Sequence, residues 1–180
     1  MVFFTTSELI GIGIGTDLVY IPSFGDQLLL DGTHFASVFT DREWAYCLTR
    51  DGVPASVSDP GPRALESLAA RWATKEAAVK AWSTLISPEA SPLDPATFNW
   101  AEIEVIHDRH NRPLLRFHGD VAQELSALET RCGGQLVWAA SFTHERNYAS
   151  ANVHLTAIRT AGAEDPPISP RPTWTHTSLL

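Results

Sequence analysis

The amino-acid sequence predicts an α+β fold, in which a small and mainly antiparallel sheet packs against a long helix and shorter helices. Three observations support this prediction: alternating apolar residues near the start, a long central helical segment, and two pairs of strand-like segments in the second half. Strands joined by short turns pair antiparallel, and separate runs of helices and strands are typical of α+β folds. The 180 residues suit one domain, which we expect at residues 1–160.

The first strand is predicted at residues 9–21, where large and small residues alternate. One face carries Ile10, Ile12, Ile14, Thr16 and Leu18, and the other carries Gly11, Gly13, Gly15 and Asp17. Three glycines on one face leave room for a ligand or for another backbone. Their spacing does not fit G-x-G-x-x-G, and they lie within a strand, so a dinucleotide-binding site is disfavoured. Alone, Asp17 indicates only a turn or cap residue.

Two short helices are predicted next, at residues 23–31 and 34–50. Thr40 and Glu43 have the spacing of a capping box, which marks the beginning of a helix. Residues 51–62 contain three prolines together with glycine and serine, and this composition predicts a loop.

A long helix is predicted from about residue 63 to 84, a segment rich in alanine and free of glycine and proline. Its apolar stripe consists of Leu65, Leu68, Ala69, Trp72 and Val79. Glu76 falls inside this stripe, and Lys80 lies at its edge. A carboxylate on an apolar face costs free energy unless a cation or hydrogen-bond donors satisfy it. Two interpretations stay open: a buried Glu76–Lys80 pair, or a metal ligand beside a cation.

The second half of the chain predicts two hairpins, with strands at residues 102–107, 113–118, 135–142 and 149–158. A helix at 119–130 separates the hairpins, and Gly133-Gly134 ends that region. The last segment has four prolines and no hydrophobic period, so we expect a flexible tail at 161–180.

Composition excludes several classes of function. A net charge of −8 argues against nucleic-acid binding. The sequence contains no run of about 18 apolar residues, so we do not expect a membrane span. The two cysteines, Cys47 and Cys132, lack metal-ligand spacing and do not suggest a disulfide framework. We therefore expect a soluble protein of the reducing cytoplasm.

Chemistry is suggested by acidic residues from two separate elements. If Asp17 and Glu76 meet in one cleft, they repel each other unless a cation lies between them, and Mg²⁺ suits few oxygen ligands completed by substrate phosphates. Three cationic residues lie near Glu76 in the sequence: Arg71, Lys75 and Lys80. They are either ordinary solvated residues or phosphate anchors. His144, which follows the strand at 135–142, is either a turn residue or a group that contacts phosphate or transfers a proton.

Three blocks of sequence carry a family resemblance. They are G-I-G-T-D-L-V at residues 13–19, the helical segment 66–81 with R-W-A-T-K-E-A-A-V-K-A at its end, and A-S-F-T-H-E at 140–145. In order and spacing, residues 9–158 resemble the holo-acyl-carrier-protein synthase family of 4′-phosphopantetheinyl transferases, and especially its actinobacterial members. The resemblance implies the 4′-phosphopantetheinyl transferase fold.

The resemblance also implies an activity, which is transfer of 4′-phosphopantetheine from coenzyme A to a serine of an apo acyl carrier protein. Adenosine 3′,5′-bisphosphate is the other product. By position, Asp17 and Glu76 match the Mg²⁺ ligands of the family, and Lys80 matches the lysine that binds the pyrophosphate. Arg71 matches an arginine near the nucleotide end of coenzyme A, and His144 a histidine of the same pocket. The base that deprotonates the serine is either Glu76 or a water at the metal.

The partners implied by the resemblance are coenzyme A, an acyl carrier protein and further copies of the chain. Other members often carry a basic residue soon after the first strand, where this chain has Pro22–Asp26 without one. A carrier domain within a type I fatty acid synthase is therefore a plausible acceptor. Short family members form homotrimers with sites at subunit boundaries. The alternative is a non-catalytic module that binds a nucleotide or carrier, and Mg²⁺-independent coenzyme A binding would favour it.

Overall fold

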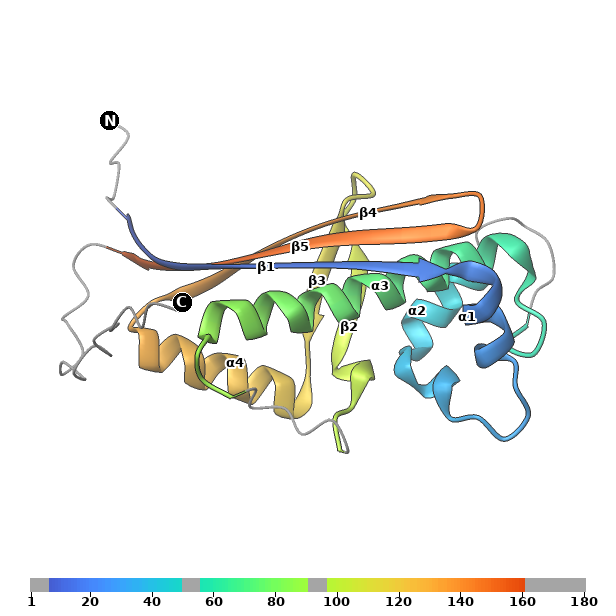
Figure 1. Cartoon of the computed structure of the whole chain (residues 1–180), viewed down its shortest axis with the longest axis horizontal. Helices are drawn as coiled ribbons and strands as arrows, with labels where there is room; N and C mark the ends of the chain where they lie inside the picture. The colour runs from blue at the N-terminus through green and yellow to red at the C-terminus, as the bar shows by residue number, and fades with distance from the viewer. Residues whose placement is uncertain (1–6, 50–55, 91–96, 161–180) are drawn as a thin grey trace, which may run out of the picture.

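A long central helix, α3 (Gly61–Ile86), lies along a three-stranded antiparallel sheet (Figure 1). The computed structural model describes residues 7–49, 56–90 and 97–160. The other helices and strands are β1 (Ser7–Tyr20), α1 (Ile21–Leu28), the 3-10 helix η1 (Phe35–Val38), α2 (Asp41–Leu48), the 3-10 helix η2 (Trp100–Glu102), β2 (Ile103–His107), β3 (Pro113–Phe117), α4 (Gly119–Cys132), β4 (Gln135–Glu145) and β5 (Tyr148–Thr160).

The sheet order is β1-β5-β4, and β2 and β3 form a separate antiparallel pair. The register places Asp17 of β1 opposite Ala151 of β5. Helices α1 and α2 lie near one end of α3, and α4 lies near the other end (Figure 1). The predicted α+β fold with antiparallel pairing is thus confirmed, whereas the expected tail at residues 161–180 lies outside the described residues.

The predicted helix at residues 34–50 is instead two shorter elements, η1 and α2. The chain is extended at Thr40, whose hydroxyl accepts a hydrogen bond from the backbone N–H of Glu43 at 3.2 Å. In return, the Glu43 carboxylate accepts one from the backbone N–H of Thr40 at 2.9 Å. The capping box is therefore confirmed, and it begins α2 at Asp41.

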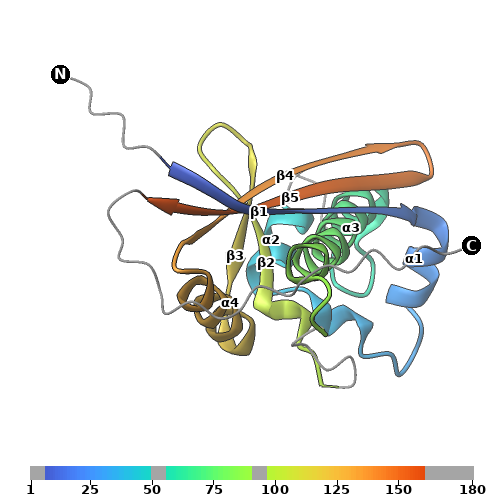
Figure 2. The same cartoon turned by 60° about the vertical axis from the view of Figure 1, so that its left-hand side comes forward.

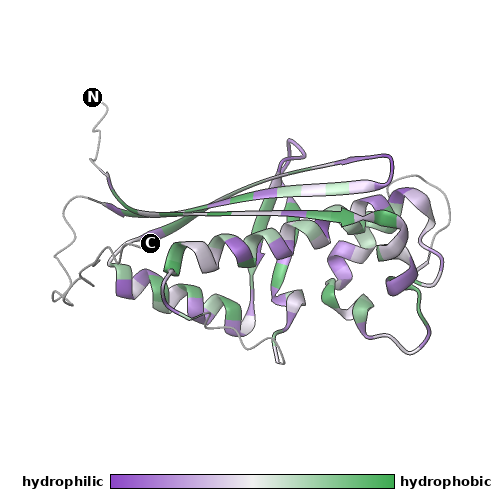
Figure 3. Cartoon of the chain, in the orientation of Figure 1, coloured by the Kyte–Doolittle hydropathy of each residue, from purple (hydrophilic) through white to green (hydrophobic). Residues whose placement is uncertain are grey.

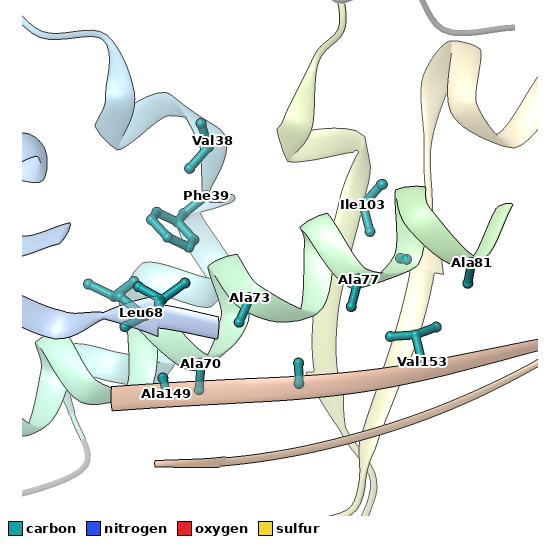
Figure 4. Packing of buried hydrophobic residues seen from close by; sticks show 14 of the residues in the cluster. Val38, Phe39, Leu68, Ala70, Ala73, Ala77, Ala81, Ile103, Ala149 and Val153 are labelled. Atoms are coloured by element: carbon teal, nitrogen blue, oxygen red, sulfur yellow. The ribbon is translucent and has the colours of Figure 1, made fainter. Parts of the chain in front are cut away.

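Small residues bring α3 close to the sheet. Figure 4 shows a row of α3 alanines whose side chains lie near Ala149 and Val153 of β5, namely Ala70, Ala73, Ala77 and Ala81. On β1, a Cβ added at Gly15 would overlap the carbonyl oxygen of Ala77, and one at Gly13 would overlap that of Ala81. The room left by these two glycines is thus taken by the backbone of α3, which decides between the two uses that their pattern allowed.

Helix α3 is buried on more sides than its apolar stripe predicted. Arg71 and Lys75, for which the sequence left open an ordinary solvated position, have relative exposures of 1% and 0%. They are buried because α2 and β2 pack against α3 below the sheet (Figure 2), and because the carbonyl oxygen of Val38 in η1 contacts Lys75. No helix in the described parts of the chain is long and apolar enough to span a membrane.

The face of β1 that points away from α3 carries large apolar residues in the open. Ile12 is 50% exposed, Ile14 is 53% exposed and Leu18 is 64% exposed. Figure 3 shows hydrophobic residues along this strand. Val137 of β4 is 48% exposed. One side of the sheet thus packs on α3, while the other presents apolar side chains to the surroundings.

Candidate functional site

The fold brings together three residues that are distant in sequence, Asp17 of β1 and Glu76 and Lys80 of α3. The glycine face of β1 lies directly against α3, so Asp17, on the same face, reaches the helix. Lys80 Nζ donates a hydrogen bond to Asp17 Oδ1 at 2.6 Å. Glu76 precedes Lys80 by one helical turn. Among the described ion pairs, Lys80 is joined to Asp17 and not to Glu76, so the i,i+4 interpretation is not supported.

Electrostatics at this site favour a proton or a cation between the two carboxyl groups. Burial and the negative charge of Asp17 together raise the pKa of Glu76 to about 7, although Lys80 acts in the opposite direction. Oδ2 of Asp17 is buried and has no hydrogen-bond donor. A buried oxygen without a donor beside a second carboxyl group is the environment in which a bound cation would lower the free energy.

These donors suit a hard divalent cation that keeps open coordination positions. Among the described residues, no group of three or more His, Cys, Asp or Glu side chains could hold a metal ion. Asp17 and Glu76 alone would supply only part of a coordination shell. Mg²⁺ is commonly bound by one or two carboxylates together with substrate phosphates and water. The residues present therefore fit a metal that binds jointly with a phosphate-containing substrate.

A cavity of about 290 Å³ lies beside the end of β4 and the turn between β2 and β3. Its lining residues are His107, Asn111, Pro113, Ser141, Phe142, Thr143 and His144. The predicted His144 is among them, and its Nδ1 lies 3.6 Å from Oε2 of Glu66 on α3. Sequence reasoning had not singled out His107 or Asn111 as site residues. His107 became recognisable only when the fold placed its ring 5.8 Å from that of Phe142 on β4.

Arg71 is buried behind this cavity. Its guanidinium donates hydrogen bonds to the carbonyl oxygen of Ser67 at 3.0 Å and to the Ser67 hydroxyl at 2.6 Å. It also lies 3.3 Å from Nδ1 of His107, which lines the cavity. No described carboxylate forms an ion pair with Arg71, and its Nε is buried without a hydrogen-bond partner. Such a cation is suited to an anionic ligand.

Lys75 lies elsewhere than its predicted role as a phosphate anchor requires. Its Nζ donates to Oε2 of Glu43 at 2.9 Å, and it also contacts the carbonyl oxygens of Val38, Trp100 and Ile103. An ammonium group has three donors, so these acceptors saturate it. Burial lowers the pKa of Lys75, and Glu43 opposes this shift. We therefore correct the interpretation of Lys75: it joins α3 to α2 and β2 inside the protein.

Paired carboxylates beside a lysine are typical of enzymes that act on phosphate-containing substrates. A model of the 4′-phosphopantetheinyl transferase superfamily matches residues 13–150, and the chain belongs to this superfamily. The expected family is thus confirmed.

The most similar relatives include actinobacterial holo-acyl-carrier-protein synthases. The protein of Corynebacterium efficiens is 38% identical over 140 residues, which cover 78% of this chain and 90% of that protein. The protein of Mycobacterium ulcerans is 37% identical over 140 residues, which cover 78% of this chain and 92% of that protein.

Solved structures show the same fold. The Chronobacterium ammoniagenes ACPS–CoA complex superposes with a TM-score of 0.68 at 35% identity, over 81% of this chain and 97% of that one. For the Mycobacterium tuberculosis acyl carrier protein synthase, the TM-score is 0.54 at 31% identity, over 83% of this chain and 99% of that one.

Proposed function

We propose that this protein is a Mg²⁺-dependent holo-acyl-carrier-protein synthase. It transfers 4′-phosphopantetheine from coenzyme A to a serine of an apo carrier and releases adenosine 3′,5′-bisphosphate. The observation that carries this proposal is the meeting of Asp17, Glu76 and Lys80 at one place on the fold. The name of the Chronobacterium complex, which contains coenzyme A, supports the substrate.

Each residue of the site has a distinct task in this reaction. Asp17 and Glu76 would hold the metal, which when bound neutralises charge on the pyrophosphate of coenzyme A. The ammonium of Lys80 stabilises the negative charge that grows on the leaving phosphate. The proton of the acceptor serine would pass to Glu76 or to a water held at the site.

The nucleotide end of coenzyme A is assigned to the cavity near β4. His144 and Asn111 line it, and the Arg71 guanidinium lies directly behind His107. A buried guanidinium without a carboxylate partner is suited to a phosphate, and His144 supplies a further donor at the rim. We therefore propose for Arg71 and His144 the roles that the resemblance implies, and none at the coenzyme for Lys75.

A transfer assay tests the proposed function. The protein is incubated with coenzyme A, Mg²⁺ and an apo carrier, and intact-mass spectrometry then measures the carrier. We expect a mass gain of one phosphopantetheine that disappears when EDTA removes the metal. Absence of this gain with every carrier tested, free or fused, refutes the proposal. Tight coenzyme A binding without Mg²⁺ and without transfer would indicate a non-catalytic module instead.

The surface of α1 bears on the choice of carrier. Its exposed residues, Pro22, Ser23, Asp26 and Gln27, include no basic side chain, and Leu29 and Leu30 beyond it are 43% and 65% exposed. The helix itself therefore offers no positive charge to an acidic carrier, although Arg146 lines the same hollow as Pro22 and Asp26. We propose that the acceptor is the carrier domain of a type I fatty acid synthase, which needs less electrostatic steering than a free acidic carrier. A panel of free and fused carriers, assayed at low and high salt, distinguishes the two.

The uncovered face of the sheet suggests an oligomer. Contiguous exposed apolar side chains mark an interaction surface, and β1 is an edge strand that needs a cover. We propose a homotrimer assembled through this face, with part of each coenzyme pocket supplied by the neighbouring subunit. We further propose a cytoplasmic location, because Cys47 and Cys132 are both free thiols.

A further inference from the structure

Tyr46 of α2 contacts three residues from three different parts of the fold. Its ring stacks on the imidazole of His107, with centroids 4.7 Å apart and an interplanar angle of 7°. The guanidinium carbon of Arg71 lies 4.5 Å from the centre of the same ring. The Tyr46 hydroxyl donates a hydrogen bond to Oδ1 of Asn111 at 3.1 Å. One side chain thus connects α3, β2 and the β2–β3 turn.

These three neighbours share a location. His107 and Asn111 line the cavity beside β4, and Arg71 approaches it through His107. Stacking on an aromatic face is favourable for both a guanidinium and an imidazole, and it restricts the orientation of each. The side-chain amide of Asn111 has a fixed direction only if one of its atoms is held by a partner, which the Tyr46 hydroxyl provides.

The turn that carries Asn111 is already rigid in its backbone. Asp108 Oδ1 accepts hydrogen bonds from the backbone N–H groups of His110 at 2.8 Å and Arg112 at 2.9 Å. Asn111 itself has a positive φ of 65°. The backbone therefore fixes the position of the Asn111 Cα atom, while the hydrogen bond from Tyr46 fixes the direction of the side-chain amide.

We propose that Tyr46 is a positioning residue for coenzyme A, orienting Arg71, His107 and Asn111 toward its nucleotide. This proposal rests on the proposed function. Tyr46 acts through its neighbours, so its loss affects the binding of coenzyme A and leaves the chemistry at Glu76 and Lys80 unchanged. The ring orients Arg71 and His107, and the hydroxyl orients Asn111, so the two contributions can be separated by substitution.

Steady-state transfer kinetics and calorimetric titration with coenzyme A test the two contributions. Tyr46→Phe removes only the hydroxyl and should raise the KM for coenzyme A about fivefold, with kcat and the KM for the carrier within about twofold of wild type. Tyr46→Leu also removes the ring and should raise it more than about tenfold. The dissociation constant for coenzyme A should increase in parallel in the absence of carrier.

A double-mutant cycle tests the contact with Asn111. If Tyr46 acts through Asn111, adding Tyr46→Phe to Asn111→Ala should cause no further rise in the KM for coenzyme A. Thr130→Val is the control, because it removes an exposed hydroxyl that bonds only to the Ser126 carbonyl within α4, and it should leave both KM values unchanged. Thermal unfolding of every variant distinguishes positioning from loss of fold.

Three outcomes overturn the proposal. The first is an unchanged KM for coenzyme A in Tyr46→Phe. The second is a double-mutant cycle in which the effects of Tyr46→Phe and Asn111→Ala on this KM are fully additive. The third is a fall in kcat of the Tyr46 variants with equal rises in the KM values for coenzyme A and the carrier. A wild-type protein that binds coenzyme A without transferring phosphopantetheine refutes only the proposed function, since calorimetry still reports on Tyr46. A wild-type protein that does not bind coenzyme A refutes both.

Discussion

The two carboxyl groups of the site have different surroundings. Glu76 has a pKa raised to about 7 by burial and by Asp17, whereas Asp17 already has Lys80 at 2.6 Å. A divalent cation would replace the proton that keeps the pair compatible. The site is thus built at a cost in the stability of the metal-free protein, and this cost is measurable.

Neutral isosteres should abolish turnover without disrupting the fold. Glu76→Gln and Asp17→Asn each remove a charge that the metal needs, so we expect kcat/KM to fall at least about a hundredfold. The transfer assay at saturating Mg²⁺ measures this, and the melting temperature of each variant confirms folding. Wild-type activity in either variant would remove that residue from the mechanism.

The stability of the metal-free protein should depend on pH through Glu76. Between the ordinary pKa of 4.5 and about 7, the folded protein binds more protons at Glu76 than the unfolded chain does. The free energy of unfolding therefore falls as pH rises through this window, by about 1–2 kcal/mol after allowance for partial exposure. Urea unfolding in EDTA at pH 5 and pH 8 measures the fall.

Glu76→Gln is the control for this pH dependence, since a glutamine cannot titrate. The difference in slope between wild type and Glu76→Gln isolates the contribution of Glu76. Added Mg²⁺ should stabilise the wild type more at pH 8 than at pH 5, because protons compete with the metal. Equal slopes in EDTA for the two proteins would contradict the assignment of the raised pKa to Glu76.

Sequence reasoning singled out Glu76 because a carboxylate on an apolar stripe violates a local pattern, and Asp17 because it shares a strand face with three glycines. It failed for Lys75 because its environment is created by residues far away in the sequence, above all Glu43. A helical projection gives the direction of a side chain but not the elements that cover it. Tyr46 was missed for the same reason: its partners come from α3, β2 and the β2–β3 turn.

At the scale of elements, the close contact between β1 and α3 positions the site. Gly15 lies where a Cβ would overlap the carbonyl oxygen of Ala77, so Gly15→Ala should force the helix from the strand. We expect a loss of about 2–3 kcal/mol in the free energy of unfolding, measured by urea denaturation. Activity should fall as well, because Asp17 and Glu76 would separate.

Gly25→Ala is the matched control for this substitution. Gly25 lies within α1, and a Cβ there would meet its nearest atom, Leu65 Cδ1, at an ordinary 3.5 Å. Alanine is a better helix former than glycine, so this variant should gain about 0.5–1 kcal/mol. Opposite signs at the two positions are expected, and equal effects would show that close packing at Gly15 is not what the glycine provides.

The Glu43–Lys75 pair joins α2 to α3 inside the protein. Lys75→Met leaves the Glu43 carboxylate buried without its cation, so we expect a loss of about 3–5 kcal/mol in the free energy of unfolding. Arg146→Met is the control, because Arg146 pairs with Glu145 at 3.6 Å but both side chains are more than four-fifths exposed. Its effect should stay below about 0.5 kcal/mol, and a comparable loss in both variants would contradict the structural role of Lys75.

Element positions followed from local chemistry, whereas their limits depended on packing. The capping box at Thr40 was predictable because both of its partners lie within four residues. The predicted strand at residues 135–142 extends to Glu145 because pairing with β5 continues to Tyr148, and no local residue signals where that pairing ends. Period-two alternation correctly divided β1 into two faces, but it did not reveal which face would remain uncovered.

For the whole molecule, the two faces of β1 have different functions. The glycine face of β1 carries Asp17 to the site, and the opposite face carries Ile12, Ile14 and Leu18 outward. The same strand therefore connects the active centre to the proposed subunit interface. Loss of the assembly should weaken coenzyme A binding, because the neighbouring subunit is proposed to complete the coenzyme pocket.

Ile12→Glu tests this connection. Ile12 is 50% exposed, so a charge there should not unfold the subunit, but in a trimer it would be buried without a partner. We expect light scattering after size exclusion to show a monomer instead of a trimer, and the KM for coenzyme A to rise at least about tenfold. Val57→Glu is the matched control, since Val57 is 48% exposed and lies in the Ser56–Asp59 turn, outside the strands of the sheet, and it should leave both mass and activity unchanged. A wild-type monomer at micromolar concentration, or an Ile12→Glu protein with the wild-type mass, would show that this face has another purpose.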